Sequence, residues 1–319
     1  MLYAPPMTSP AQKRTHFLAY SAALAAVAFS LSLVAAKAFV WLQGDSTAML
    51  SSLIDSSVDT IVSFTNFLAI RYALQPADAD HRYGHGKAEG VAALAQAAFI
   101  GGSCVFLLLE AIRRLSEPSP VQAVSLGVII LVCGTIGTII LSTYQRWVAK
   151  QTKSLAVEAD SAHYTSDIAL NLGIILSLMV GQQEGWELLD PIVALGIVAW
   201  LIWCARGIML KALNMLLDRE VEDHVRLAIK DRILGTPGVE SMHDLRTRRS
   251  GPALLVSFDI EVAPELSLKD AHEISRQVEE NVLTQVTEEF PHTEVMIHID
   301  PRGDTSDSRH KRMKDFHAH

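Results

Sequence analysis

The chain has 319 residues, of which 50% are hydrophobic and only 19% are charged. The charged residues gather at the two ends and in short connecting segments, a distribution typical of a membrane protein with a soluble appendage. The net charge of -8, together with the lack of a basic stripe with interleaved aromatic residues, excludes a general nucleic-acid binder. The three cysteines show no CxxC spacing, which argues against a disulfide framework or a zinc finger.

Apolar segments fill most of the chain up to residue 214. Each is long enough to cross a membrane as a helix, because a span needs about 20 residues. The first segment is too long for the apolar core of a cleavable signal peptide. The sequence therefore predicts an α-helical membrane protein with six transmembrane helices. The six segments lie near residues 17–40, 48–70, 91–114, 121–145, 155–180 and 188–214.

The basic residues in the connections predict the orientation of these helices. The N-terminal arm and the loops after the second and fourth segments carry Lys and Arg, whereas the connections at 43–47 and 181–187 carry none. Cytoplasmic loops are generally enriched in these two residues. We therefore expect both termini to lie in the cytoplasm, although Arg113 and Arg114 run against the trend.

The sequence from about residue 217 has the pattern of a soluble domain. Helical periodicity, a Ser267 helix cap and alternating apolar residues give the element order αββαβ. This order predicts a sheet covered by two helices. The helices are expected over 221–234 and 267–290, and the strands around 239–248, 253–262 and 293–300.

These patterns divide the chain into four predicted parts. Residues 1–15 form an N-terminal cytoplasmic arm, and residues 16–216 form the transmembrane domain. Residues 217–301 form the cytoplasmic αββαβ domain. Residues 302–319 lack periodicity and are expected to be a disordered tail that contains histidines.

Two pairs of potential metal ligands lie inside apolar segments. Asp55 and Asp59 are spaced i, i+4, and so are His163 and Asp167, so each pair projects from one face of its helix. A single Asp could simply accept hydrogen bonds from neighbouring helices. Ionisable groups in a membrane are, however, costly unless they pair, face water or hold an ion. Three carboxylates and an imidazole therefore predict a four-ligand site for a divalent transition metal.

An empty site of this composition also favours protons. Loss of water and mutual repulsion make it harder for three neighbouring carboxylates to stay charged. Metal ions and protons would therefore compete for the same ligands. Such competition is typical of a metal/proton exchanger.

A second candidate site lies in the loop after the second segment. Asp78, His81 and His85 recur at three- and four-residue spacing. A turn or the start of a helix would bring the three side chains to one ion. The alternative is that this segment is a solvated polar loop.

A third candidate cluster lies in the soluble domain. His298 and Asp300 are expected on the same face of a strand, because strand side chains alternate. The alternative is that the histidines are ordinary surface residues. The candidate ligands of this cluster are His243, Asp259, His272, His298 and Asp300.

Several long motifs resemble those of a known family. They are QPADADHRYGHGKAEGVAALAQAAFI, the DSSVD and HYTSD membrane pairs, LLDRE after the sixth segment and HDLRTRRSG at the start of the soluble domain. From about residue 16 to 301 the chain resembles the cation diffusion facilitator family, specifically its bacterial zinc/iron efflux branch. The resemblance implies a homodimer in the bacterial inner membrane, with six transmembrane helices per protomer and a metallochaperone-like cytoplasmic domain. It also implies export of a divalent metal in exchange for protons by alternating access.

The resemblance also implies roles for individual residues. The membrane, loop and soluble clusters match the family's transport site, its loop site and its cytoplasmic binuclear site, in which Asp300 is similar to a bridging carboxylate. Asp259 stands where close relatives have histidine, which keeps an oxygen ligand but makes the site harder. Lys87 and Asp218 resemble a charged interlock that holds the dimer together at the membrane surface. The alternative for this pair is two solvated charges.

Two other functions compete with transport. One is a metal sensor whose membrane part only anchors it, which would not need acidic ligands in two spans. The other is an intramembrane metallohydrolase, but the sequence has no HExxH helix. We therefore expect a secondary active transporter rather than an enzyme, with the bilayer, metal ions, protons and a second copy as its partners. The imidazole favours Zn2+ as cargo, ahead of Fe2+, Mn2+, Cd2+ and Co2+.

Overall fold

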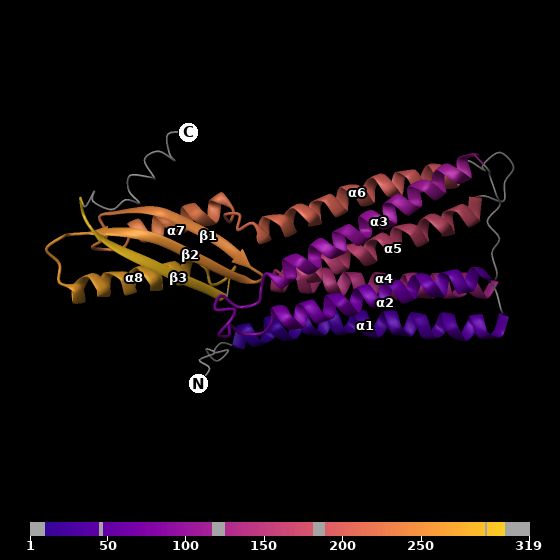
Figure 1. The fold of residues 1–319 in the computed structure, drawn as a ribbon, viewed down its shortest axis with the longest axis horizontal. Helices are drawn as coiled ribbons and strands as arrows, with labels where there is room; N and C mark the ends of the chain where they lie inside the picture. The colour runs from indigo at the N-terminus through magenta and orange to yellow at the C-terminus, as the bar shows by residue number, and fades with distance from the viewer. Residues whose placement is uncertain (1–9, 45–46, 117–124, 181–188, 291, 304–319) are drawn as a thin grey trace. The chain divides into compact units, whose positions relative to one another are not determined.

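A computed structural model of the chain describes residues 10–44, 47–116, 125–180, 189–290 and 292–303 (Figure 1). The chain divides into two compact units, Met1–Leu216 and Leu217–His319. The predicted arm is partly helical, because the first helix already begins at Pro10. Most of the predicted tail, residues 304–319, lies outside the described residues.

Long helices form the first unit (Figure 1). Five helices in the described part of the chain are long and apolar enough to cross a membrane. The fifth helix in chain order is not among them, and its sequence contains Glu158, Asp160, His163 and Asp167. The predicted helical membrane fold is confirmed, with five of the six expected spans meeting both criteria. The helices are α1 (Pro10–Gly44), α2 (Thr47–Ala73), α3 (Ala88–Ser116), α4 (Ser125–Thr152), α5 (Leu155–Val180) and α6 (Leu189–Leu216).

The helix that carries His163 and Asp167 is the central one. α5 packs against each of the other five helices of the first unit. Small side chains let these helices approach closely, since Ala22, Ala93, Ala156 and Ala212 are fully buried between them. Large apolar side chains such as Phe106 are exposed instead, as expected for a surface that faces lipid. Asp160 and His163 of α5 are thereby buried in protein.

The second unit has the predicted element order. α7 (Asp223–Leu234) precedes a hairpin of β1 (Ser241–Ser250) and β2 (Ala253–Val262), and α8 (Leu268–Val286) leads to β3 (His292–Pro301). The sheet order is β1-β2-β3, with β2 antiparallel to β1 and parallel to β3. The predicted cap of α8 is confirmed, because the hydroxyl of Ser267 accepts a hydrogen bond from the backbone N–H of Asp270 at 3.2 Å.

The core of the second unit lies on one face of this sheet. Leu254, Val256, Phe258 and Ile260 of β2 are buried in one cluster with residues of both α7 and α8. Because strand side chains alternate, the intervening residues of β2, Asp259 among them, point to the opposite face. The sheet therefore presents a polar face that the helices do not cover.

Candidate metal sites

Three of the four predicted membrane ligands come together between α2 and α5. Asp59, His163 and Asp167 each offer a ligand atom, and these atoms lie within 4.8 Å of one another. Nε2 of His163 lies 3.5 Å from Oδ1 of Asp59 and 3.8 Å from Oδ2 of Asp167. Ligand atoms on a tetrahedral zinc ion are about 3.4 Å apart when the bonds are about 2.1 Å long. The three atoms are therefore spaced much as ligands around a shared centre would be.

Asp55 lies outside this group. It is one turn before Asp59 on α2, and its side chain is exposed. The two carboxylates nevertheless interact electrostatically. The assignment of Asp55 as the fourth ligand stays a prediction.

Packing between helices holds the imidazole of His163 in place. The side chain is only 4% exposed, and its ring meets the edge of Phe99 on α3 at a centroid distance of 5.4 Å. The next residue, Tyr164, shares a 2.8 Å hydrogen bond with the hydroxyl of Ser63 on α2. This bond fixes α2 against α5 beside the three ligands. The side chains of Asp59 and Asp167 are 30% and 28% exposed, so this chain does not fully cover the carboxylate side of the site.

A buried carboxylate next to this site was missed by the sequence reasoning. Asp160 lies one turn before His163 on α5 and is 1% exposed. Its two oxygens accept hydrogen bonds from the amides of Gln96 on α3, at 2.9 Å, and Gln145 on α4, at 2.5 Å. The signal in the sequence is the i, i+3 spacing to His163 inside an apolar segment, whereas the two predicted membrane pairs are spaced i, i+4. Asp160 thus ties α3 and α4 to the helix that carries two of the candidate ligands.

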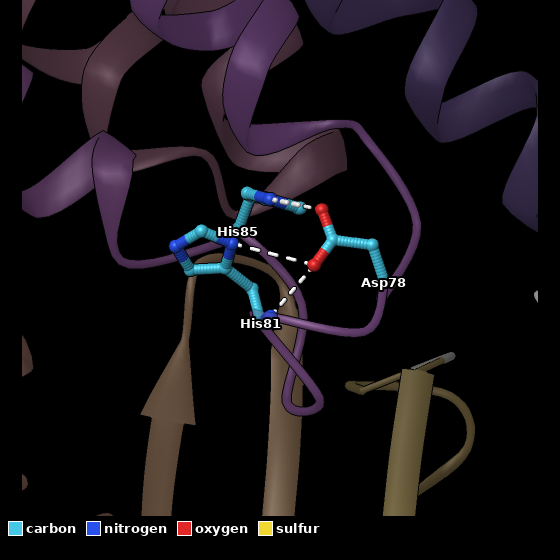
Figure 2. Close-up of side chains that lie close together, drawn as sticks. All are labelled: Asp78, His81 and His85. Carbon is cyan, nitrogen blue, oxygen red and sulfur yellow. Dashed lines mark hydrogen bonds and ion pairs between the residues drawn. The ribbon is translucent and has the colours of Figure 1, made fainter.

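The loop between α2 and α3 brings its three predicted ligands together, as Figure 2 shows. Oδ1 and Oδ2 of Asp78 lie 3.4 Å from Nδ1 of His81 and 3.3 Å from Nε2 of His85. Gly84 has a φ of +76°, a backbone conformation that favours glycine, and it turns the chain between the two histidines. His85 is buried and packs edge-on against Tyr72, with ring centroids 4.5 Å apart. The three side chains therefore converge, and the binding of a metal ion between them stays a prediction.

Backbone groups prepare the loop carboxylate for a positive charge. The pKa of Asp78 is lowered, first because the backbone N–H of His81 donates to its carboxylate and also because the N–H of Asp80 does. These two hydrogen bonds are 2.6 Å and 2.9 Å long. Hydrogen bonds to the charged form of a carboxylate favour that form. The side chain is therefore held ionised and in one orientation.

The cluster in the second unit lies on the polar face of the sheet. In the strand register, Asp259 of β2 is opposite His243 of β1 on one side and His298 of β3 on the other. Asp300 follows two residues after His298, which places both on the same face as predicted. Nε2 of His298 lies 3.0 Å from Oδ1 of Asp300. The three adjacent strands thus line up four of the five predicted ligands.

His243 is the centre of this polar cluster. Its Nδ1 lies 3.6 Å from Asp259 and its Nε2 lies 3.7 Å from Asp300, and these three residues offer ligand atoms within 4.8 Å of one another. Glu261, which the sequence reasoning missed, also lies 3.7 Å from Nε2 of His243. His272 is exposed on α8 and does not belong to the group, so the structure does not bring it to the other candidates within one chain.

The sequence matches two family models in succession. One describes the cation efflux transmembrane domain and covers residues 23–217, and the other describes the cytoplasmic domain of cation efflux proteins and covers residues 221–302. The chain belongs to the cation efflux family, the cation diffusion facilitators. The cation-efflux pump FieF of Cronobacter sakazakii is 43% identical over 280 residues, which are 88% of this chain and 92% of that protein. FieF of Klebsiella pneumoniae is 42% identical over the same shares.

Solved structures add only a partial likeness. A nickel form of a MamM CTD variant is 26% identical and covers 25% of this chain and 99% of that one, with a TM-score of 0.23.

The family membership confirms the resemblance drawn from the motifs, and this cation diffusion facilitator is a membrane transporter for cations. The family model that matches residues 221–302 is named for a dimer, which implies that this domain dimerises.

The predicted interlock of this cation diffusion facilitator involves residues of both units. Lys87 belongs to the first unit and Asp218 to the second. Within the second unit, Oδ2 of Asp218 lies 3.3 Å from Nη1 of Arg248, so this carboxylate also has a partner on β1. The pairing of Lys87 with Asp218 stays a prediction.

Proposed function

We propose that this cation diffusion facilitator exports Zn2+ from the cytoplasm through the site formed by Asp59, His163 and Asp167, with Asp55 as the fourth ligand. The observation that carries the proposal is the convergence of three ligand atoms, from two helices, within 4.8 Å. Neither helix can form the site alone. A relative shift of α2 and α5 would therefore assemble or dismantle it, as alternating access requires.

The charges of the site support exchange against protons. A divalent ion on three carboxylates and a neutral imidazole leaves a net charge near -1, whereas an empty site would concentrate negative charge inside the membrane domain. Protons are the cations that can replace the departing metal on the same ligands. The partial exposure of Asp59 and Asp167, against the buried His163, supports entry and exit of both ions on the carboxylate side.

The ligand set supports zinc as the principal cargo. Imidazole suits zinc, copper, iron and nickel, whereas sites of oxygen ligands alone suit magnesium, calcium and manganese. One nitrogen with two or three oxygens lies between these classes and is compatible with Fe2+, Mn2+, Cd2+ and Co2+ as secondary cargo. The buried histidine is the residue that tilts the preference to Zn2+.

We further propose the setting in which this exporter works. It is a homodimer in the bacterial inner membrane with both termini in the cytoplasm, as the basic connections support. The interlock of Lys87 with Asp218 holds the dimer together at the cytoplasmic surface. The arm of residues 1–15 and the tail of residues 302–319 flank the transmembrane domain, 16–216, and the cytoplasmic domain, 217–301.

The loop and cytoplasmic clusters would bind the same metal without transporting it. The row of His243, Asp259 and His298 is supported by the strand register, and the dimer implied for this domain would bring two such faces into one assembly. His272, on α8, could join a metal there only from the second copy. Metal bound between protomers would draw the acidic faces together and favour the conformation competent for transport.

Zinc uptake into proteoliposomes tests the proposed transport site. Asp59→Ala and Asp167→Ala should each abolish uptake while leaving a folded dimer in size-exclusion chromatography. Glu158→Gln is the matched control, because Glu158 lies on α5 as well but pairs with Lys211, at 2.5 Å, away from the site. Near wild-type uptake by either alanine variant would overturn the assignment, and loss in the control as well would point to a general fault in α5.

A further inference from the structure

A lysine inside α1 reaches across to the helix that carries Asp55 and Asp59. Lys37 lies within an apolar span, Lys13–Gln43. Its Nζ donates a 2.7 Å hydrogen bond to the hydroxyl of Ser56 and a 3.2 Å hydrogen bond to the carbonyl of Ser52. Ser52 is one turn before Asp55 on α2, and Ser56 directly follows it. The ammonium is thus fixed beside the first of the predicted carboxylates.

The hydrogen bonds of Lys37 do not balance its charge, because both acceptors are neutral. The balancing groups are carboxylates, since Lys37 interacts electrostatically with Asp59, Asp55 and Asp167. A charged lysine within a membrane helix is costly and calls for a partner. The carboxylates that act on Lys37 are those of the candidate metal ligands. α1 itself contains no acidic residue in its sequence.

We propose that Lys37 is a fixed counter-cation of the transport site, which weakens the binding of a divalent metal and so speeds its release. The inference rests on the proposed function, because it takes Asp59 and Asp167 as ligands of the cargo. The ammonium stabilises the carboxylates when the metal has left and repels the metal when it is bound. It thereby makes both the loaded and the empty site less negative by one charge, which favours the empty site because the cargo is itself positive.

The charge of the cargo makes this role measurable. The energy of repulsion between a fixed positive charge and a divalent ion is twice that between the same charge and a proton at the same place. If its removal tightens zinc binding about tenfold, it should tighten proton binding at the same ligands only about threefold. Lys37 would therefore bias the exchange towards protons. If Lys37 only held α1 against α2, its removal would not tighten zinc binding and proton binding in this ratio.

Neutral and charged replacements separate the two roles. Lys37→Gln keeps a hydrogen-bond donor for Ser56 but removes the charge, Lys37→Arg keeps the charge, and Lys37→Met offers a second neutral variant should the glutamine fail to fold. Zinc binding to the full-length dimer is measured by equilibrium dialysis, and the share that Asp59→Ala removes is assigned to the transport site. Proton competition is measured as the pH dependence of that share, and turnover as saturating uptake into proteoliposomes.

The inference predicts a specific pattern in these data. The neutral variants should bind zinc about tenfold tighter at the Asp59-dependent site and turn over more slowly at saturating zinc, and Lys37→Arg should resemble the wild type. Unchanged or weaker zinc binding in a folded neutral variant would overturn the role of Lys37 while leaving the transport site intact. If Asp59→Ala removes no zinc at all, the proposed function fails instead.

Discussion

The membrane cluster and the cytoplasmic cluster use the same ligand types on different supports. Asp59 meets His163 and Asp167 across two helices, whereas His243, Asp259 and His298 stand in one row on three hydrogen-bonded strands. A shift of one helix along another changes the first set, but the strand register fixes the second. The comparison shows how one chemistry can serve both release and retention of a metal. We expect the first site to open during transport and the second to stay assembled.

Loss of a membrane ligand should have the most severe consequence. Asp167→Ala removes a charged ligand and a proton acceptor together, so saturating zinc uptake should fall at least about a hundredfold, in keeping with the 10–100-fold losses known even for outer-shell partners of metal sites. Uptake into proteoliposomes at saturating zinc checks this. If the variant keeps more than a tenth of wild-type uptake, the membrane cluster is not the transport site, and the comparison of a transporting with a retaining cluster fails.

Loss of a cytoplasmic ligand should weaken transport only at low zinc. Asp300→Ala removes a carboxylate that lies 3.7 Å from His243 and 3.0 Å from His298, but it leaves the membrane ligands in place. Uptake should fall severalfold at limiting zinc and recover at saturation. Energy transfer between labelled cytoplasmic domains, titrated with zinc, provides the second readout. Identical closure in wild type and variant would remove the regulatory role from this cluster.

Asp160 should matter through the position of α5 rather than through metal contact. Asp160→Leu leaves the amides of Gln96 and Gln145 buried without their acceptor, which should lower the free energy of unfolding by about 1–3 kcal/mol. Asp160→Asn keeps one acceptor oxygen and should be affected less. Thermal unfolding in detergent measures the stability of both variants. Zinc binding at the Asp59-dependent site is measured on the same samples. An equal loss in the two variants would show that the charge, and not the hydrogen bonding, matters.

Acid should affect the loop site through its imidazoles before its carboxylate. The hydrogen bond from the backbone N–H of His81 lowers the pKa of Asp78. The stability that this charge contributes is therefore present above the ordinary pKa of Asp and is lost only as pH falls through the lowered value. Zinc and protons compete for the imidazole nitrogens, so zinc binding by the loop should weaken as pH falls, before Asp78 takes up a proton. Zinc titration of an Asp59→Ala, Asp300→Ala background follows this site, and a midpoint near pH 4 would contradict the order.

Local patterns predicted most of the fold. Apolar length gave the helices, alternation gave the strands, and Ser267 marked the start of α8 as expected. The His163/Asp167 pair and the loop spacing likewise found side chains that lie together, because those distances are set within one helix or one turn, whereas Asp55 lies outside the membrane group. Such signals depend only on the spacing of residues along the chain, which can be read from the sequence.

Contacts between elements were harder to foresee. Glu261 joins the cytoplasmic cluster only because of how β1 and β2 pair, and His272 is separated from it because α8 lies on the other face of the sheet. Asp160 and Lys37 were missed because their partners come from other helices. In each case the information lies in register or helix packing, which no short motif records.

The most direct test of the transport site is zinc X-ray absorption spectroscopy on the full-length dimer. The loop and cytoplasmic sites are first removed by Asp78→Ala, His81→Ala, His243→Ala and Asp300→Ala, so that the remaining zinc reports on the membrane site alone. We predict one imidazole and otherwise oxygen ligands at about 2.0–2.1 Å. His163→Ala should abolish the imidazole scattering in this background. An imidazole signal that persists in that variant, or zinc that stays bound in Asp59→Ala, would contradict the assignment of Asp59, His163 and Asp167 as the ligands of the exported metal.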